Sequence, residues 1–136
     1  MGNVNLLAVV LGSLAFFGIG ALWYGPLFGK AWKALVGYDG EKMPYPTAKL
    51  PVWLVMLLAF ALEMLVVLML GHNIARSNPA PHVIMMMAVG FGAVIMTPAI
   101  GINYLFQMRP GKLFAIDAGY MIVGMAAVGG VFVALS

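Results

Sequence analysis

The chain has 136 residues, of which 64% are hydrophobic and only 8% are charged. This composition excludes an ordinary soluble protein, and the length fits a single domain. The formal net charge is +3, but no continuous basic face or stripe exists, so we expect no nucleic-acid partner. The sequence has no cysteine, which excludes thiol catalysis, disulfides and thiolate metal sites.

Four apolar segments, residues 5–24, 51–71, 82–106 and 112–135, dominate the sequence. Each reaches or exceeds the roughly 20 residues that cross a bilayer as a helix. The sequence therefore predicts an all-α integral membrane protein, with residues 1–136 forming one domain of four transmembrane helices. The first segment is expected to remain as a membrane helix, since no basic residue precedes it and it is long for a signal peptide.

The segments that join these helices differ sharply in charge. Of the seven Lys and Arg residues, five lie in the first and third joining segments and a sixth, Lys112, lies at the edge of the third, whereas only Arg76 lies in the second. Loops rich in Lys and Arg stay in the cytoplasm, so both termini are predicted to lie on the opposite, outer side of the membrane. The cytoplasmic loops should then contact anionic lipid headgroups.

Two segments beside the membrane helices carry further local signals. Gly25-Pro26 is predicted to end the first helix, because proline disfavours helical backbone at the preceding residue. Residues 27–36 then predict a short amphipathic helix in the cytoplasmic interface, with Lys30 and Lys33 opposite an apolar arc. In the later helices, we expect the second to end near Gly71 and the third to kink at Pro98.

Glu63 is the first candidate functional residue. It follows Pro51 by 12 residues, which places it about 18 Å along the second helix, near the middle of the membrane. No neighbour on its own helix face can pair with it, and an ionised carboxylate at such depth costs at least roughly 2.5–3.5 kcal/mol on insertion scales. It should therefore be protonated, or have a partner on another helix or across an oligomer interface. A proton- or cation-handling role and a neutral structural role both remain open.

Asp117 is the second candidate, about 7 Å from the cytoplasmic end of the fourth helix. Tyr120 follows on the same face, and side chains of the third and first helices reach the same depth: Asn103, Tyr104, Trp23 and Tyr24. One interpretation is a hydrogen-bonded cluster between helices, in which Arg109 or Lys112 compensates the charge. The other is a ligand or ion site, since ionisable groups within membrane helices are usually functional.

Metal binding and catalysis have weaker support. His72, His82 and three consecutive methionines, Met85–Met87, suggest a copper site. Consecutive residues of a helix point about 100° apart, however, so the three methionines cannot converge on one ion. No catalytic triad spacing, zinc-binding helix or phosphate loop is found. We therefore expect no metal, no cofactor and no enzymatic activity.

Two stretches together resemble a known family. The first ends the first helix and reads WYGPLFGKAW over residues 23–32; the second runs from Asn103 through Arg109 to the stretch KLFAIDAGY over residues 112–120. The pairing resembles the bacterial family of small four-helix membrane proteins catalogued as domain of unknown function 1761, over nearly the whole chain. The resemblance implies this architecture in a bacterial inner membrane, where the outward-facing termini would be periplasmic, and it implies no activity. It also groups five residues in one cluster, which does not include Glu63: Trp23, Tyr24, Asn103, Asp117 and Tyr120.

Three functions fit these observations. A homo-oligomeric carrier or channel would use Glu63 or Asp117 to handle a proton or cation, with the glycine-rich faces of the first and fourth helices as the oligomer contact. The oligomer is needed because four packed helices leave no aqueous pore. A non-catalytic accessory or structural subunit of a larger membrane complex is the alternative. An intramembrane enzyme ranks third, and the carrier or channel is the favoured hypothesis.

Overall fold

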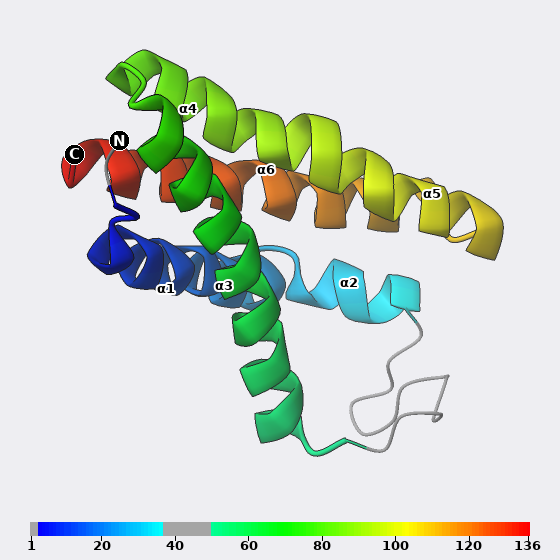
Figure 1. Cartoon of the computed structure of the whole chain (residues 1–136). Helices are drawn as coiled ribbons and strands as arrows, with labels where there is room; N and C mark the ends of the chain where they lie inside the picture. The colour runs from blue at the N-terminus through cyan, green and yellow to red at the C-terminus, as the bar shows by residue number, and fades with distance from the viewer. Residues whose placement is uncertain (1–2, 37–49) are drawn as a thin grey trace.

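A computed structural model describes residues 3–36 and 50–136, and Figure 1 shows these residues as an all-α fold. Four helical stretches are long and apolar enough to cross a membrane: Leu6–Leu27, Val52–Ser77, Pro81–Gln107 and Gly111–Ala134. A fifth, short helix, α2, covers Gly29–Val36. The predicted fold class, with its four membrane spans and one short amphipathic helix, is confirmed.

Helix α6 (Gly111–Ala134) is the centre of the bundle. It packs on one side against α1 (Leu6–Leu22) and on the other against the third span, which consists of α4 (Pro81–Gly90), a π-helical segment η2 (Phe91–Met96) and α5 (Thr97–Gln107) (Figure 1). The two ends of the chain meet, since Nδ2 of Asn5 donates to the carbonyl of Leu135 at 3.2 Å. Helix α3 (Val52–Ser77) packs mainly against α1, and its N-terminal half leans away from the other spans (Figure 1).

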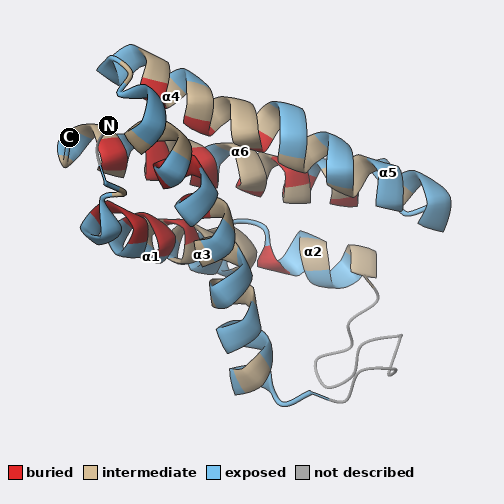
Figure 2. Cartoon of the chain, in the orientation of Figure 1, coloured by how far each residue is buried: buried red, intermediate tan, exposed pale blue. Residues whose placement is uncertain are grey.

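Buried residues gather in the half of the bundle that holds the two termini, as Figure 2 shows in red. Small residues make this packing possible. A Cβ atom at Gly124 of α6 would lie 2.5 Å from Cδ1 of Phe16, and one at Gly129 would lie 2.8 Å from Cβ of Ala88. The expectation that the glycine-rich faces serve an oligomer contact is therefore wrong for these glycines, because neighbouring helices of the same chain already fill the space.

The first span does not stop at Gly25-Pro26 as predicted. It continues through a π-helical turn, η1 (Trp23–Leu27), which contains Pro26. Proline has no N–H to donate to the preceding turn, and the wider π-turn accommodates it: the N–H of Phe28 donates to the carbonyl of Trp23 at 2.8 Å. Helix α2 follows directly. Its first residue must be small, since a Cβ at Gly29 would lie 2.6 Å from the carbonyl oxygen of Tyr24.

The second span is longer than predicted. Gly71 does not end it, since α3 continues to Ser77. A Cβ at Gly71 would lie 3.1 Å from the ring of Phe132 and 3.2 Å from Val9, so this glycine allows close packing inside the helix. The helix instead ends at Ser77, where Asn78 adopts a left-handed conformation with φ 45°. Asparagine is one of the few residues that tolerates this conformation.

The third span is interrupted close to Pro98, as predicted, but the interruption is a π-helical segment rather than a simple kink. Segment η2 ends at Met96, just before Thr97 and Pro98. The hydroxyl of Thr97 donates to the carbonyl of Gly92 at 2.7 Å. A proline removes one N–H donor from the backbone hydrogen bonds of a helix. The wider π-turn accommodates the proline, and the hydroxyl of Thr97 supplies a donor to a backbone carbonyl in its place.

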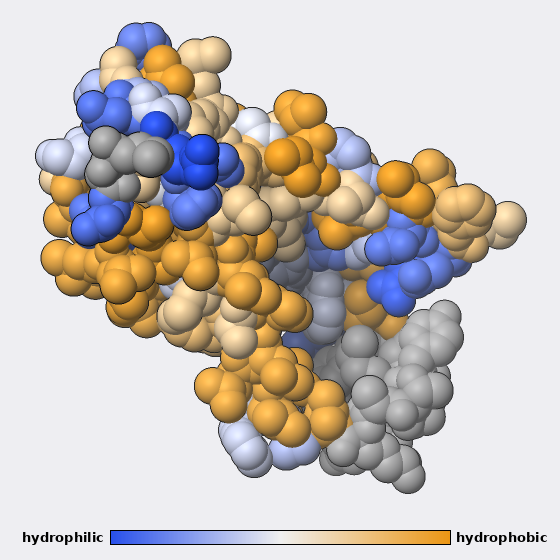
Figure 3. Space-filling view, in the orientation of Figure 1, coloured by the Kyte–Doolittle hydropathy of each residue, from blue (hydrophilic) through white to orange (hydrophobic). Residues whose placement is uncertain are grey.

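The surface has the pattern that a membrane-spanning bundle needs. Apolar side chains cover α3 and the outer side of α1 in Figure 3, whereas hydrophilic side chains gather near the chain ends and again near the end of α5. Large side chains on α3 are strongly exposed, among them Leu57 at 56% and Leu62 at 64%. Such exposure suits lipid rather than water. The chain is a small multi-pass membrane protein.

Candidate functional site

Glu63 has its partner on another helix, as one branch of the prediction required. The hydroxyl oxygen of Tyr120, on α6, lies 2.6 Å from Oε1 of Glu63 and 2.8 Å from the carbonyl oxygen of Phe16, on α1. The second carboxyl oxygen of Glu63, Oε2, is buried and has no hydrogen-bond partner among the described residues. A single tyrosine thus joins three helices around one carboxyl group.

Counting protons shows which state of Glu63 completes these bonds. The hydroxyl of Tyr120 carries one hydrogen, and the carbonyl of Phe16 can only accept. If Tyr120 donates to Phe16, the short contact to Glu63 is satisfied only when a protonated Glu63 donates to the tyrosine oxygen. If Glu63 is ionised, Tyr120 must turn its hydrogen to the carboxylate and leave Phe16. The neutral acid therefore makes both hydrogen bonds, and the ionised acid makes one.

Asp117 is held differently. The hydroxyl of Tyr24, in η1, donates to Oδ1 at 2.5 Å, and the hydroxyl of Tyr104, on α5, donates to Oδ2. Each carboxyl oxygen thus accepts from its own phenol, an arrangement in which the ionised form uses both acceptors. Asp117 is half-buried in the first half of α6 and ties the ends of three helical segments together.

The two acids belong to one cluster, which sequence reasoning treated as two. The rings of Tyr24 and Tyr120 meet edge to face, with their centroids 5.4 Å apart. Asp117 and Tyr120 lie one turn apart on α6, so a single helix carries the centre of both hydrogen-bonded groups. The tyrosine–carboxyl cluster, as we name it, consists of Glu63, Tyr120, Tyr24, Asp117 and Tyr104.

The expected charge compensation of Asp117 is not found. Among the described residues, no Lys or Arg forms an ion pair with it, and its partners are the two phenols. Arg109 instead lies over the ring of Tyr104, 5.5 Å from the centroid, and its Nε donates to Oε1 of Gln107 at 2.7 Å. Lys112 is exposed on the first turn of α6. The reason is geometric: α5 ends at Gln107, and Arg109 turns back over α5 rather than toward α6.

Two residues that the sequence grouped with Asp117, Trp23 and Asn103, are not part of the tyrosine–carboxyl cluster. Trp23 donates from Nε1 to the carbonyl of Ile116 at 2.8 Å, and its ring fills the space beside Gly119, where a Cβ would lie 2.8 Å away. Trp23 thus packs α1 against α6. Asn103 is exposed on α5 and takes no part in the hydrogen bonds of the cluster.

Sequence reasoning missed the main-chain carbonyl of Phe16 and the glycine that lets Tyr120 reach it. A Cβ at Gly20 would lie 2.7 Å from the hydroxyl oxygen of Tyr120. The sequence did contain a spacing that indicates a packing face on α1. Gly12, Phe16 and Gly20 are four residues apart and so share one face of the helix. No sequence pattern marks a carbonyl as a partner.

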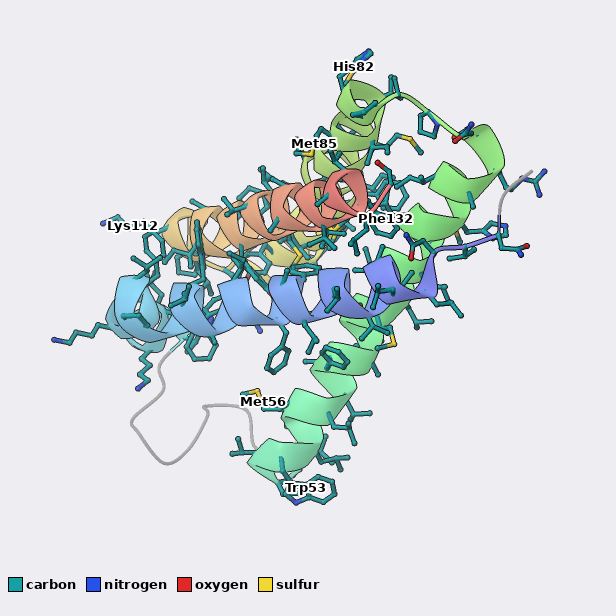
Figure 4. All side chains as sticks on the ribbon, turned by 90° about the vertical axis from the view of Figure 1, so that its left-hand side faces the viewer. Trp53, Met56, His82, Met85, Lys112 and Phe132 are labelled. Carbon is teal, nitrogen blue, oxygen red and sulfur yellow. The ribbon has the colours of Figure 1, made fainter. Side chains whose placement is uncertain are left out.

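The residues of the copper hypothesis diverge, as the helix geometry predicted. Figure 4 shows His82 at the end of the bundle opposite Lys112. Sδ of Met85 packs toward α6, where it would lie 3.0 Å from a Cβ at Gly129, whereas the neighbouring Met86 is 68% exposed. Within residues 3–36 and 50–136, no group of three or more His, Asp or Glu side chains is arranged to hold a metal ion.

Comparison with known proteins gives a family. No curated protein and no solved structure matches the chain. One family matches residues 7–133, and its description is "Protein of unknown function (DUF1761)". The match includes both motifs noted in the sequence and all five residues of the tyrosine–carboxyl cluster. This multi-pass membrane protein, with its two carboxyl groups held by tyrosines, belongs to the DUF1761 family.

Proposed function

We propose that this protein takes up and releases a proton or a small cation within the membrane, as a homo-oligomeric carrier or channel, with Glu63 as the exchanging group. The observation that carries the proposal is the second carboxyl oxygen of Glu63. Oε2 is buried and has no hydrogen-bond partner among the described residues. A purely structural carboxyl is expected to use its acceptors, because a buried polar atom without a partner is costly. A carboxyl group that must exchange its proton or bind a cation keeps one oxygen atom free as an acceptor.

Tyr120 supports exchange because it can serve both protonation states. Its hydroxyl oxygen is within hydrogen-bonding distance of Glu63 and of the carbonyl of Phe16 at the same time. Loss of the proton from Glu63 requires only that the hydroxyl hydrogen rotate from Phe16 to the carboxylate. No heavy atom has to move, so the change between the two states needs no repacking of α1, α3 and α6.

Asp117 has a different role in this proposal. Its two oxygens are already occupied by Tyr24 and Tyr104, so it is a fixed anion that holds the helix ends together. It lies toward the end of the bundle that carries Lys30, Lys33, Arg109 and Lys112, which we name the basic end. We infer that the basic end faces the cytoplasm of a bacterial inner membrane, on the bias of Lys and Arg.

An oligomer is part of the proposal because α6 fills the centre of the protomer. Its inward residues are buried, among them Met125 and Val128, each with no exposed surface. Gly18 and Gly130 have no atom within 4 Å of an added Cβ, and they leave room for a second chain. We propose no catalytic activity, since the sequence carries no catalytic triad spacing, zinc-binding helix or phosphate loop.

A non-catalytic accessory subunit is the second candidate, and α3 favours it. The N-terminal half of this helix leans away from the bundle (Figure 1), and Val52 and Trp53 are 71% and 68% exposed. Such a helix offers a long apolar face to the helices of another membrane protein. Purification discriminates the two candidates, because a carrier should be stable as a homo-oligomer whereas an accessory subunit should co-purify with a larger protein.

The test uses the purified full-length chain in proteoliposomes that contain a pH-sensitive dye, with an imposed pH gradient and then with Na⁺ or K⁺ gradients. We expect flux in the wild type and none in Glu63→Gln, which keeps the hydrogen bond but cannot ionise. Asp117→Asn is the matched control, an acid-to-amide change in the same cluster, and should retain flux. Equal flux in wild type and Glu63→Gln, or no flux of protons or cations through folded wild type, would overturn the proposal.

A second readout does not depend on transport. A protonated carboxyl group has an infrared C=O stretching band that an ionised one lacks. Titration of the wild type in lipid should change the intensity of a band that is absent from Glu63→Gln and present in Asp117→Asn. A band that never changes over the stable pH range would show that Glu63 keeps its proton and is structural.

A further inference from the structure

A hollow of about 430 Å³ lies between the end of α5 and the start of α6. This volume is within the range of roughly 300–1,000 Å³ that is typical of small-molecule sites. Apolar and aromatic side chains form most of its wall: Tyr104, Leu105, Met108 and Phe114. The rings of Tyr104 and Phe114 meet edge to face at 5.9 Å. The wall can therefore receive a hydrocarbon chain.

Glycine gives the hollow its depth. A Cβ at Gly101 would already lie 3.2 Å from Cε1 of Phe114, so a larger residue there would push into the hollow or displace the ring. Gly111, at the start of α6, also lines the hollow. The space thus depends on two positions without side chains, one on each of the two helices.

The charged side chain that lines the hollow is Arg109. Its Nε donates to Gln107, and within the described part of the chain its two Nη groups have no hydrogen-bond partner. Lys112 lies on the next turn and marks the same end of the bundle in Figure 4. The nearest acid along α6 is Asp117, whose two oxygens already accept from tyrosines. The lining is therefore mostly apolar with one cation, Arg109, and within residues 3–36 and 50–136 no carboxylate forms an ion pair with it.

We propose that this hollow binds one acyl chain of an anionic phospholipid, whose phosphate is held by Arg109 and Lys112. Two observations select this occupant. Five of its seven lining residues belong to the third and fourth candidate membrane spans, so lipid chains are the expected neighbours of the hollow. Arg109 of its lining and the nearby Lys112 lie at the basic end of those spans, where headgroups begin. Guanidinium binds phosphate through paired hydrogen bonds. A soluble anion would match the cation but would leave the apolar wall unused.

Tyr104 connects the lipid site to the tyrosine–carboxyl cluster. Its ring is part of the wall and lies under the guanidinium of Arg109, and its hydroxyl donates to Asp117. A bound phosphate that draws Arg109 away from the ring would change the surroundings of a side chain that holds Asp117. The lipid site does not need Glu63 to exchange a proton, so the two proposals can fail separately.

The test measures lipid binding by native mass spectrometry of the detergent-purified full-length protein. Phosphatidylglycerol is compared with phosphatidylcholine of the same acyl chains and with glycerol phosphate, which has the anion but no chain. We expect retention of phosphatidylglycerol, weaker retention of phosphatidylcholine, and none of glycerol phosphate. Equal retention of the two phospholipids would overturn the role of the cations, and binding of glycerol phosphate would overturn the role of the hollow.

Arg109→Gln should weaken phosphatidylglycerol binding about fivefold, the effect expected from the loss of one cation beside an anionic lipid. Arg76→Gln is the matched control, because Arg76 is the other arginine and lies in the last turn of α3 at the opposite end of the bundle. It should bind phosphatidylglycerol as the wild type does, and so should Glu63→Gln. Equal losses in Arg109→Gln and Arg76→Gln would show a general charge effect and refute the site.

Discussion

Tyr120 reaches Glu63 through the space that a glycine leaves open. The two side chains come from α6 and α3 and meet at 2.6 Å, although α3 packs mainly against α1. The hydroxyl passes Gly20 of α1, where a Cβ would lie 2.7 Å from it. This contact ties the leaning helix α3 to the centre of the bundle, so it bears on stability as well as on any exchange of protons.

Tyr120→Phe should therefore destabilise the protein, while Glu63→Gln should not. The phenylalanine keeps the ring contact with Phe16 but removes both hydrogen bonds of the hydroxyl. Bonds between membrane helices are worth roughly 0.6 kcal/mol on average and up to about 1.7, so we expect a loss of about 1 kcal/mol. The amide of Glu63→Gln can still donate to Tyr120. Thermal unfolding in detergent measures both variants, and a lower melting temperature for Glu63→Gln than for Tyr120→Phe would contradict the neutral-acid geometry.

Asp117→Ala should cost more than Glu63→Gln, because it removes the acceptor of two phenols at once. Tyr24 and Tyr104 would each retain a half-buried hydroxyl without its partner, at about 1–3 kcal/mol for the group left unsatisfied. Tyr24→Phe and Tyr104→Phe complete double-mutant cycles with Asp117→Ala. Each tyrosine change should lower the free energy of unfolding less in the Asp117→Ala background than in the wild type. Unfolding by Glu63→Gln with no effect of Asp117→Ala would mean that the roles of the two acids are reversed.

The glycines of α6 offer a test that separates packing from helix propensity. Gly124→Ala places a Cβ 2.5 Å from the ring of Phe16, and the buried ring cannot move without disturbing Tyr120. Gly130→Ala places its Cβ in open space and should be neutral or stabilising, since alanine is a better helix former by about 1 kcal/mol. The two changes are chemically identical and lie on one helix. Equal melting temperatures would show that α1 and α6 are not packed this closely.

If Gly130→Ala dissociates an oligomer while the protomer stays folded, the result bears on contacts between chains and not on packing within one chain. It would place this glycine in a contact between chains rather than against lipid. Size-exclusion chromatography of the same two variants gives that answer, and Gly124→Ala serves as the control for an effect on folding alone.

The spans were predictable because hydropathy and length are local properties of the sequence. The residues at which the helices end were harder to predict. Gly25-Pro26 and Gly71 are ordinary stop signals, yet a π-turn absorbs Pro26, and Gly71 is a packing position between Val9 and Phe132. Both outcomes depend on which helix lies alongside, and that information is absent from any window of the chain.

The site was predictable residue by residue but not in its pairing. Depth in a helix identified Glu63 and Asp117 as unusual, and the same argument from depth placed Tyr24 and Tyr104 at the level of Asp117. Sequence reasoning did not pair Tyr120 with Glu63, because that pairing depends on how α3 and α6 both pack against α1. One interpretation also expected Arg109 or Lys112 to compensate the charge of Asp117, whereas two phenols are its partners among the described residues. Opposite charge is a simple rule for pairing, and hydrogen-bond donors on neighbouring helices overrode it.

Orientation in the membrane is the remaining prediction, and it determines where the lipid site and the tyrosine–carboxyl cluster lie. The two chain ends meet through Asn5 and Leu135, and Figure 4 shows Lys112 far from Phe132, near the other end of α6. The bias of Lys and Arg then predicts periplasmic termini and a cytoplasmic basic end. A phosphatase reporter fused after Ser136 should be active and a cytoplasmic reporter inserted between residues 37 and 50 should also be active. The reverse pattern at both positions would move the basic end to the periplasm, where Arg109 would face the outer leaflet. Replacing Lys30 by Gln should weaken the orientation bias without changing the fold, since this side chain is exposed on α2.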